Sequence, residues 1–126
     1  MKLNLDCMRA VMLQIEELPF QKEFSFNELC EQLPKYSKDE LSYTCIKLKE
    51  ANLINAMISN TDNITQVLSL NDLTYEGHQF LADIRSDSIW NKTKSVLSEL
   101  GSTSVSVAIQ VAASIVQSLI AGKINL

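Results

Sequence analysis

The change in hydrophobic period along the chain is the feature that most constrains its fold. In the N-terminal part, apolar side chains recur every three or four positions, a spacing that places them on one face of an α-helix. Two short runs rich in β-branched residues follow, Ile54–Ser59 and Ile64–Leu70, and the segment Asn60–Asn63 between them tolerates turn geometry. Helical spacing then resumes to the end of the chain. We therefore expect helices, then a β-hairpin, then further helices.

Local signals set the expected ends of the helices before the hairpin. Residues 5–18 carry the first apolar stripe, which a proline ends. Asn27 is placed to cap a short second helix that reaches residue 33. Ser37 opens a third helix, and Glu40 stands three positions later, at the spacing of a capping box.

Three more helices are expected after the hairpin. Thr74 caps a helix over residues 75–85, and the next begins at Ser86 or Asp87 and stops at Gly101, a residue that suits the left-handed end of a helix. The last helix begins after residues 102–104 and runs to about residue 121.

Three helices followed by a two-stranded hairpin is the order of a winged helix-turn-helix core. The segment Lys49–Ile54 resembles the end of a winged-helix recognition helix, with Asn52 where many such proteins turn at a glycine with positive φ. Leu73–His78 resembles the start of the helix after the wing in many small regulators. The predicted fold class is mainly α with a small β-hairpin (α+β). We expect a winged-helix domain over residues 1–85 and a C-terminal helical extension over residues 86–126.

Four separated segments carry a more specific resemblance, namely Met1–Cys7, Leu33–Ser37, Gly77–Leu81 and Ile89–Lys94. Together they resemble a family of small bacterial and prophage-encoded proteins, domain of unknown function twenty-five thirteen. The resemblance covers nearly the whole chain and implies a winged-helix core and a bacterial or phage source. It implies no activity and no site residues.

The residues that catalysis requires are not grouped in this sequence. His78 is the only histidine, and Cys7, Cys30 and Cys45 are too widely spaced for a metal site or a disulfide framework. The three glycines are isolated, so no phosphate-binding loop is present. We predict a protein that is not an enzyme and uses no cofactor and no metal. Buried free thiols and the absence of a secretion signal favour the cytoplasm of a bacterial host.

Charge separates two classes of partner. The net charge is −4, and no lysine or arginine lies between Lys49 and Arg85, so the hairpin would repel phosphate. A second basic group beyond the hairpin, made by Arg85, Lys92 and Lys94, is typical of a solvated face unless it joins the third helix. The third helix offers the candidate face for a protein partner or for DNA, with an outward isoleucine beside a tyrosine that favours protein: Lys35, Lys38, Ser42, Tyr43 and Ile46. The alternative is that later helices cover this face.

The last helix is uncharged from residue 100 to residue 122. A narrow polar stripe lies opposite a broad apolar arc. Such an arc is compatible with packing on the chain's own domain, with an oligomer, or with a membrane span; the glutamines, the serines and the missing aromatic belt disfavour the span. We predict self-association through the arc, whose residues are Val105, Ala108, Ile109, Ala112, Ile115, Val116 and Leu119.

The sequence thus predicts a winged-helix interaction protein, phage-linked, that self-associates as a homo-oligomer and binds a protein partner of unknown identity. The alternative is a DNA-binding transcriptional regulator that uses Lys35, Lys38, Ser42 and Tyr43 at the groove. A weaker alternative is a membrane-active effector that acts through the last helix.

Overall fold

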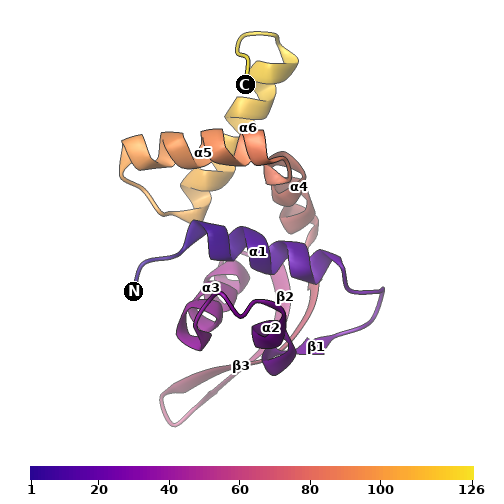
Figure 1. Ribbon diagram of the computed structural model, residues 1–126. Coiled ribbons are helices and arrows are strands. Elements are labelled where there is room, and N and C mark those ends of the chain that lie inside the picture. The colour runs from indigo at the N-terminus through magenta and orange to yellow at the C-terminus, as the bar shows by residue number, and fades with distance from the viewer.

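The computed structural model describes all residues from 1 to 126 and shows a mainly α protein with a three-stranded antiparallel sheet (Figure 1). The fold therefore belongs to the α+β class and has six helices. In chain order the elements are α1 (Leu5–Glu16), β1 (Phe24–Ser25), α2 (Phe26–Gln32), α3 (Lys38–Glu50), β2 (Ile54–Thr61), β3 (Ile64–Leu73), α4 (Tyr75–Ile84), α5 (Asp87–Leu100) and α6 (Val105–Ile120).

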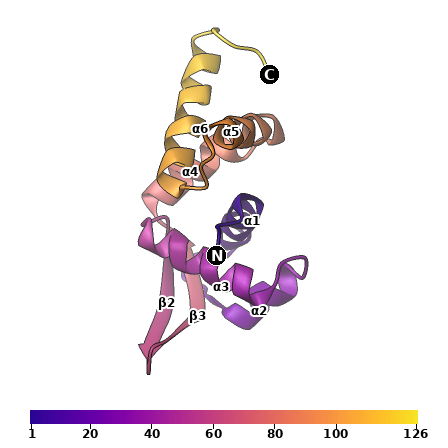
Figure 2. The same ribbon diagram turned by 90° about the vertical axis from the view of Figure 1, so that its left-hand side faces the viewer.

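The first helix lies at the centre of the molecule. The two views place α2, α3 and the sheet on one side of α1, and α4, α5 and α6 on the other (Figures 1 and 2). Five of its apolar residues are accordingly buried almost completely: Cys7, Met8, Val11, Met12 and Ile15. One hydrophobic core contains side chains from α1, α3, the sheet, α4, α5 and α6. This core includes residues from both of the ranges 1–85 and 86–126, whose division into two units stays a prediction.

Two predicted helix caps differ from those in the structure. Ser25, not Asn27, caps α2, because its hydroxyl oxygen accepts from the Glu28 N–H (3.2 Å) in a capping box, and the cap at Asn27 is therefore wrong. Ser37 caps α3 as predicted, accepting from the Glu40 N–H (3.1 Å). The Glu40 carboxylate, however, accepts from Asn4 Nδ2 (2.9 Å), so the return half of that capping box is replaced by a tie between α3 and the start of α1.

The predicted hairpin is present and longer than expected. Asp62 and Asn63 both have positive φ, which makes a two-residue turn whose twist matches the strands, and the strands extend to include residues 60, 61 and 71–73. The strand order is β1-β3-β2, with Phe24 opposite Leu70. β1 has only two residues, too few to show the alternation that identifies a strand in a sequence. The hairpin extends away from the helices (Figure 2).

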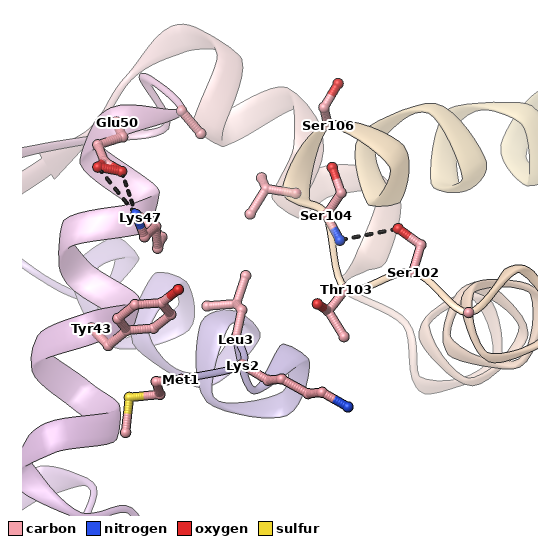
Figure 3. Close-up of a pocket in the computed structure, with 13 residues that line it drawn as sticks. Met1, Lys2, Leu3, Tyr43, Lys47, Glu50, Ser102, Thr103, Ser104 and Ser106 are labelled. Carbon is pink, nitrogen blue, oxygen red and sulfur yellow. Dashed lines mark hydrogen bonds and ion pairs between the residues drawn. The ribbon is translucent and has the colours of Figure 1, made fainter.

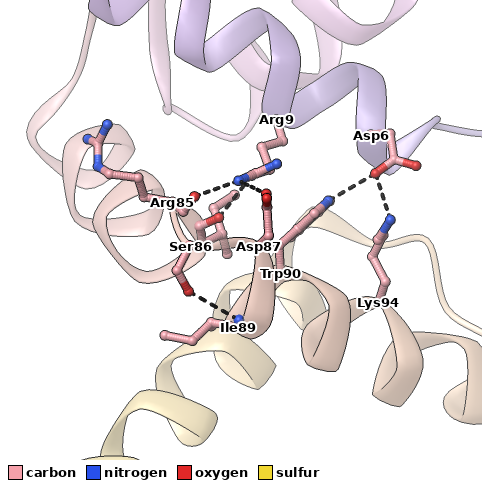
Figure 4. Close-up of polar contacts among 9 residues, drawn as sticks. Asp6, Arg9, Arg85, Ser86, Asp87, Ile89, Trp90 and Lys94 are labelled. Atoms are coloured by element: carbon pink, nitrogen blue, oxygen red, sulfur yellow. Dashed lines mark hydrogen bonds and ion pairs between the residues drawn. The ribbon is translucent and has the colours of Figure 1, made fainter. Parts of the chain in front are cut away.

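A polar cluster joins α5 to α1 (Figure 4). Trp90 Nε1 and Lys94 Nζ both donate to one carboxylate oxygen of Asp6, each at 2.9 Å. Arg9 donates to the Asp87 carboxylate (3.0 Å) and to a carbonyl at the end of α4, while its guanidinium lies 5.9 Å from the centre of the Trp90 ring. Charged groups of α1 thus fix the corner between α4 and α5.

Replacing Gly77 by alanine tests the contact between α4 and the start of β2. A Cβ atom at this position would lie 2.0 Å from the Leu53 carbonyl oxygen. Glycine to alanine inside a helix normally stabilises by about 0.5–1 kcal/mol, but here we expect a loss of at least about 2 kcal/mol in the free energy of unfolding, measured by urea denaturation. Gln79→Ala, an exposed change in the same helix, is the control and should stay within about 0.5 kcal/mol of the parent. Equal stability of the two variants would contradict the close approach.

The Asp6 cluster makes part of the stability depend on pH. The hydrogen bond from Lys94 is the largest cause that lowers the pKa of Asp6. Partial burial of the carboxylate raises this pKa, and the hydrogen bond from Trp90 lowers it further. A carboxylate with a lowered folded pKa stabilises the fold above its unfolded pKa of about 3.9, and this contribution is lost as the pH falls through the folded value.

We therefore expect the urea midpoint of Asp6→Asn to fall less than that of the parent as the pH drops below about 4. The difference should be small because the Asp6 side chain is half exposed. Asp39→Asn, which removes an exposed carboxylate of α3 that makes no ion pair, is the matched control. Identical pH profiles for the parent and Asp6→Asn would show that the cluster does not act in this way.

Candidate functional site

The surface of α3 that faces the hairpin forms a groove, which we call the helix–hairpin groove. One helical stripe supplies its first wall, because Lys38, Ser42, Ile46 and Lys49 recur at spacings of three or four. The groove has two adjoining parts that share Thr65. Their other lining residues come from the start of α2, the end of α3 and the two hairpin strands: Ser25, Phe26, Asn27, Glu50, Ile58, Asn60, Gln66, Val67 and Leu68.

The local fold explains why this surface is open. Leu41, Thr44, Cys45 and Leu48 occupy the opposite side of α3 and are fully buried in the core. Of the segments that follow the hairpin, the start of α6 lies beside Tyr43 and Lys47 on another side of α3, and none of them contributes a residue to the groove, so they do not cover it (Figure 2). Within the stripe, Lys38 and Lys49 are exposed, whereas Ser42 and Ile46 are half-buried.

The charges in the groove are unevenly balanced. Glu50 forms an ion pair with Lys47 (2.8 Å), whereas Lys38 and Lys49 have no carboxylate partner. Lys49 Nζ instead donates to the backbone carbonyl of Ala56 at 2.6 Å. The strand residues that line the groove are all uncharged, and the two acids of the hairpin, Asp62 at the turn and Asp72 near the end of β3, are not among them. The groove is therefore weakly cationic along α3 and neutral along the strands.

The five residues predicted for the partner or DNA face do not form one surface. Lys38, Ser42 and Ile46 line the helix–hairpin groove. Tyr43 lines a different pocket beside Lys47, whose Nζ lies 5.3 Å from the centre of its ring. Lys35 precedes α3, is exposed, and lies over the ring of Tyr36 at 5.6 Å.

Sequence reasoning missed one member of the stripe and the whole strand wall. Lys49 could have been found, because it continues the spacing of Lys38, Ser42 and Ile46 by one more turn. The strand residues could not, because their place depends on how the hairpin lies against α3.

The second pocket lies between α3, the N-terminal residues and the connection from α5 to α6 (Figure 3). Tyr43 and Lys47 stand on one side and Ser102 to Ser104 on the other, with Leu3 between them. Its volume is about 680 Å³, and the Lys47–Glu50 ion pair lies at its rim. No buried polar side chain lacks a hydrogen-bond partner anywhere in the chain. The pocket therefore contains no buried polar side chain that lacks a partner.

The second basic group, made by Arg85, Lys92 and Lys94, does not join the surface of α3. Arg85 forms an ion pair with Glu16, and Lys94 forms one with Asp6, so α1 balances both charges. Lys92 is exposed on α5, on the far side of α1 from α3. These cations add nothing to the surface of α3.

The last helix has a buried edge and an open stripe. Ala108, Ala112 and Ile115 are buried within the chain, where α6 packs against α5 and α4. The C-terminal half of α6 extends past α5 (Figures 1 and 2). A neighbouring line of apolar side chains, which we call the α6 stripe, is half-buried or exposed: Val105, Ile109, Ala113, Val116 and Ile120. Of these, Ile120 is 75% exposed.

This division corrects the predicted self-association surface. Ala108, Ala112 and Ile115 already contact their own chain, so packing on the chain's own core accounts for that edge. Val105, Ile109, Val116 and the half-buried Leu119 retain accessible surface. Ala113 and Ile120 share the stripe but were absent from the prediction. The apolar arc is broad enough to include both the buried edge and the exposed α6 stripe, and helical periodicity alone does not distinguish the two.

The residues considered for chemistry are not arranged for it. No three His, Cys, Asp or Glu side chains are grouped so as to hold a metal ion. Cys45 is buried, and this burial raises its pKa to about 12, which keeps the thiol protonated and unreactive. His78 is exposed, with Asp72 3.9 Å away as its acidic neighbour. No helix combines the length and the apolar character needed to cross a membrane.

These features define an α+β protein with an open helix–hairpin groove and an exposed apolar helix. The chain belongs to the family described as "Hypothetical protein (DUF2513)", whose sequence model matches residues 2–104. This confirms the family resemblance found in the four sequence segments.

Similarity extends beyond the family model in one relative. A Haemophilus influenzae protein described as "Uncharacterized protein" is 30% identical over 123 residues, which cover 96% of this chain and 100% of the relative. The family model ends directly before α6, whereas the similarity to this relative includes it. No solved structure matches the chain.

Proposed function

We propose that the chain is a winged helix-turn-helix protein that acts without catalysis, binds a protein partner in the helix–hairpin groove and self-associates through the α6 stripe. The order of α1, α2, α3 and the β2–β3 hairpin supports the winged-helix assignment. Asn52 supports it further, because it has φ +59° at the junction of α3 and β2, where a winged helix turns into its wing.

The charge of the hairpin is the observation that favours a protein partner. A winged helix contacts DNA through its recognition helix, while its wing reaches phosphates or the minor groove. Here the hairpin has no cation, Asp62 lies at its turn, and the whole chain carries −4. Ile46 and Ile58 add apolar surface to the groove, as the centre of a protein interface requires.

Self-association is supported by the composition and exposure of α6. No charge interrupts the helix, and its free end leaves apolar side chains in solvent, a combination that pairing with a second copy would relieve. A twofold arrangement places the same stripe on both sides of the contact. Each stripe is then covered by its copy.

The chemistry of the cysteines supports a reducing compartment, because all three thiols are free. Together with the Haemophilus relative, this favours the cytoplasm of a bacterial host. The phage linkage implied by the family resemblance stays a prediction.

DNA binding is the second candidate, for one specific reason. Lys38 and Lys49 have no acidic partner and lie on the same stripe of α3. On this alternative they would contact phosphates, while Ser42 between them faced the bases.

Charge introduced into the α6 stripe should prevent self-association. The double variant Val116→Glu, Ile120→Glu places two carboxylates in the proposed contact, and we expect its dissociation constant to rise at least about tenfold. Light scattering after gel filtration, over a range of loading concentrations, should show the parent above the monomer mass of 14.1 kDa and the variant at that mass.

The matched control is Gln110→Glu, Gln117→Glu, which makes the same change in net charge on the polar side of α6. This control should associate like the parent. A parent that remains monomeric at every concentration, or a control that dissociates equally, would refute the proposed surface.

Filling the helix–hairpin groove should abolish binding of the protein partner. Ser42→Arg places a large side chain between α3 and β3. We expect affinity capture from the native host, quantified by mass spectrometry, to recover a partner with the parent and at least about tenfold less of it with the variant. Ser98→Arg, which makes the same change on the exposed side of α5, should capture as much as the parent.

A mobility-shift assay with mixed-sequence duplex DNA distinguishes the two candidates. We expect no shift at low salt. A shift that weakens steeply with salt and is lost in Lys38→Ala would instead assign the groove to DNA.

A further inference from the structure

The second strand of the hairpin has a free edge. In the order β1-β3-β2, β3 is central and β2 has a neighbour on one side only. The eight residues Ile54–Thr61 include no charge, no proline and no glycine, although edge strands usually carry such residues to discourage further pairing. Both register shifts skip a residue of β3, namely Leu68 and Asn71, so β2 itself stays regular. This edge is therefore competent to pair with another strand.

The turn fixes which backbone groups reach the free edge. Thr61 and Ile64 close the two-residue turn as a hydrogen-bonded pair, and alternation from there directs the N–H and C=O of Asn60 and Ile58 away from β3. Nearer the base of the hairpin, the Ala56 carbonyl accepts from Lys49 Nζ at 2.6 Å. The Lys49 side chain thus satisfies one backbone carbonyl of this edge, whereas the outward backbone groups of Ile58 and Asn60 lie open.

The side chains beside this edge suit an extended apolar segment. Ile46 and Ile58 line the groove on the α3 side, and Met57 is 57% exposed on the other face of the sheet. The side chains of a strand added to β2 would alternate between these two surfaces. Alternate apolar residues in the added strand would therefore be buried on each face.

Charge selects the kind of segment. Lys49 stands at the base of the edge without a carboxylate partner, while the nearby Glu50 is paired with Lys47. An acidic residue on an added strand could take the Lys49 ammonium from the Ala56 carbonyl, in a stronger charge-assisted bond. The β2 strand of a second copy has no acid to offer, and a polynucleotide would approach Asp62.

We propose that the free edge of β2 binds an extended, acidic peptide segment of the partner protein as an additional strand, with a carboxylate of that segment on Lys49. This inference rests on the proposed function, because the edge forms one side of the helix–hairpin groove. Main-chain hydrogen bonds supply the affinity, while Lys49 and the apolar pockets supply the selectivity.

A random-sequence peptide display library provides the probe, with segments of about eight residues to match the strand. Selection on the full chain should enrich sequences that carry apolar residues at neighbouring positions, one toward each face, and aspartate or glutamate near one end. Fluorescence anisotropy of the best selected peptide then measures its affinity. Enrichment of basic peptides, or failure to select any peptide, would overturn the proposal.

A pair of substitutions at Asn60 separates the contribution of its backbone N–H from that of its side chain. Asn60→Pro removes an N–H that faces the open edge and none that pairs with β3, so the hairpin should persist. We expect the affinity for the selected peptide to fall about tenfold, whereas Asn60→Ala, which loses only the side chain, should stay within about twofold. Lys49→Gln should weaken binding at least about fivefold and reduce its dependence on salt. Equal affinities for Asn60→Pro and Asn60→Ala would overturn the proposal.

The peptide itself gives a second measurement that leaves the protein unchanged. The same sequence, N-methylated at alternate residues, cannot donate along the edge and should bind at least about tenfold more weakly. Binding equal to that of the parent peptide would show that no strand is added.

Partner capture distinguishes failure of strand addition from failure of the proposed function. If Ser42→Arg loses the partner while Asn60→Pro and Lys49→Gln retain it, strand addition is overturned and the proposed function stands. If Ser42→Arg retains the partner, the proposed function fails.

Discussion

Burial of α1 from two sides is the constraint on which the rest of the structure depends. Its apolar residues are shared between the layer of α3 with the sheet and the layer of α4 with α5, so both layers close on one helix. The polar side chains between α1 and α5 are hydrogen-bonded as well, since Asp6 accepts from Trp90 and Lys94, and Arg9 donates to Asp87. Because α1 takes up the inner faces of its neighbours, the outer side of α3, the hairpin and the end of α6 remain exposed. Those are the surfaces available for partners.

Much of this fold could be predicted from the sequence because many of its signals are local. The caps of Ser37 and Thr74 act over three residues, and Gly101 ends α5 with φ +67°, as its position in the pattern indicated. The exceptions depend on contacts between distant segments. β1 exists as a strand only because Phe24 pairs opposite Leu70, and Glu40 turns to Asn4, thirty-six residues earlier. Periodicity carries no information about such partners.

The candidate site shows the same limit. The sequence analysis assigned Lys38, Ser42, Tyr43 and Ile46 to one face. Tyr43 lies one position and about 100° around the helix from Ser42, and in the structure it lines a different pocket. Only the hairpin and the connection to α6, packed on different sides of α3, divide these residues between two pockets. In α6, likewise, the sequence marks a single apolar arc, and the position of α5 decides which part of that arc is buried.

The base of the hairpin is fixed much more firmly than its tip. The Leu53 carbonyl accepts from the Thr74 N–H (3.0 Å), the Thr74 hydroxyl donates to the Asn52 carbonyl (2.7 Å), and Gly77 lets α4 approach the same segment. Beyond this anchor, only the partner strand holds the residues around Asp62. The length of the hairpin is therefore free to vary: two residues added to each strand beside the turn would lengthen it and keep the turn on the same face with a hydrogen-bonded closing pair, whereas one residue in each strand would move the turn to the opposite face. Relatives could differ in reach while sharing an identical core.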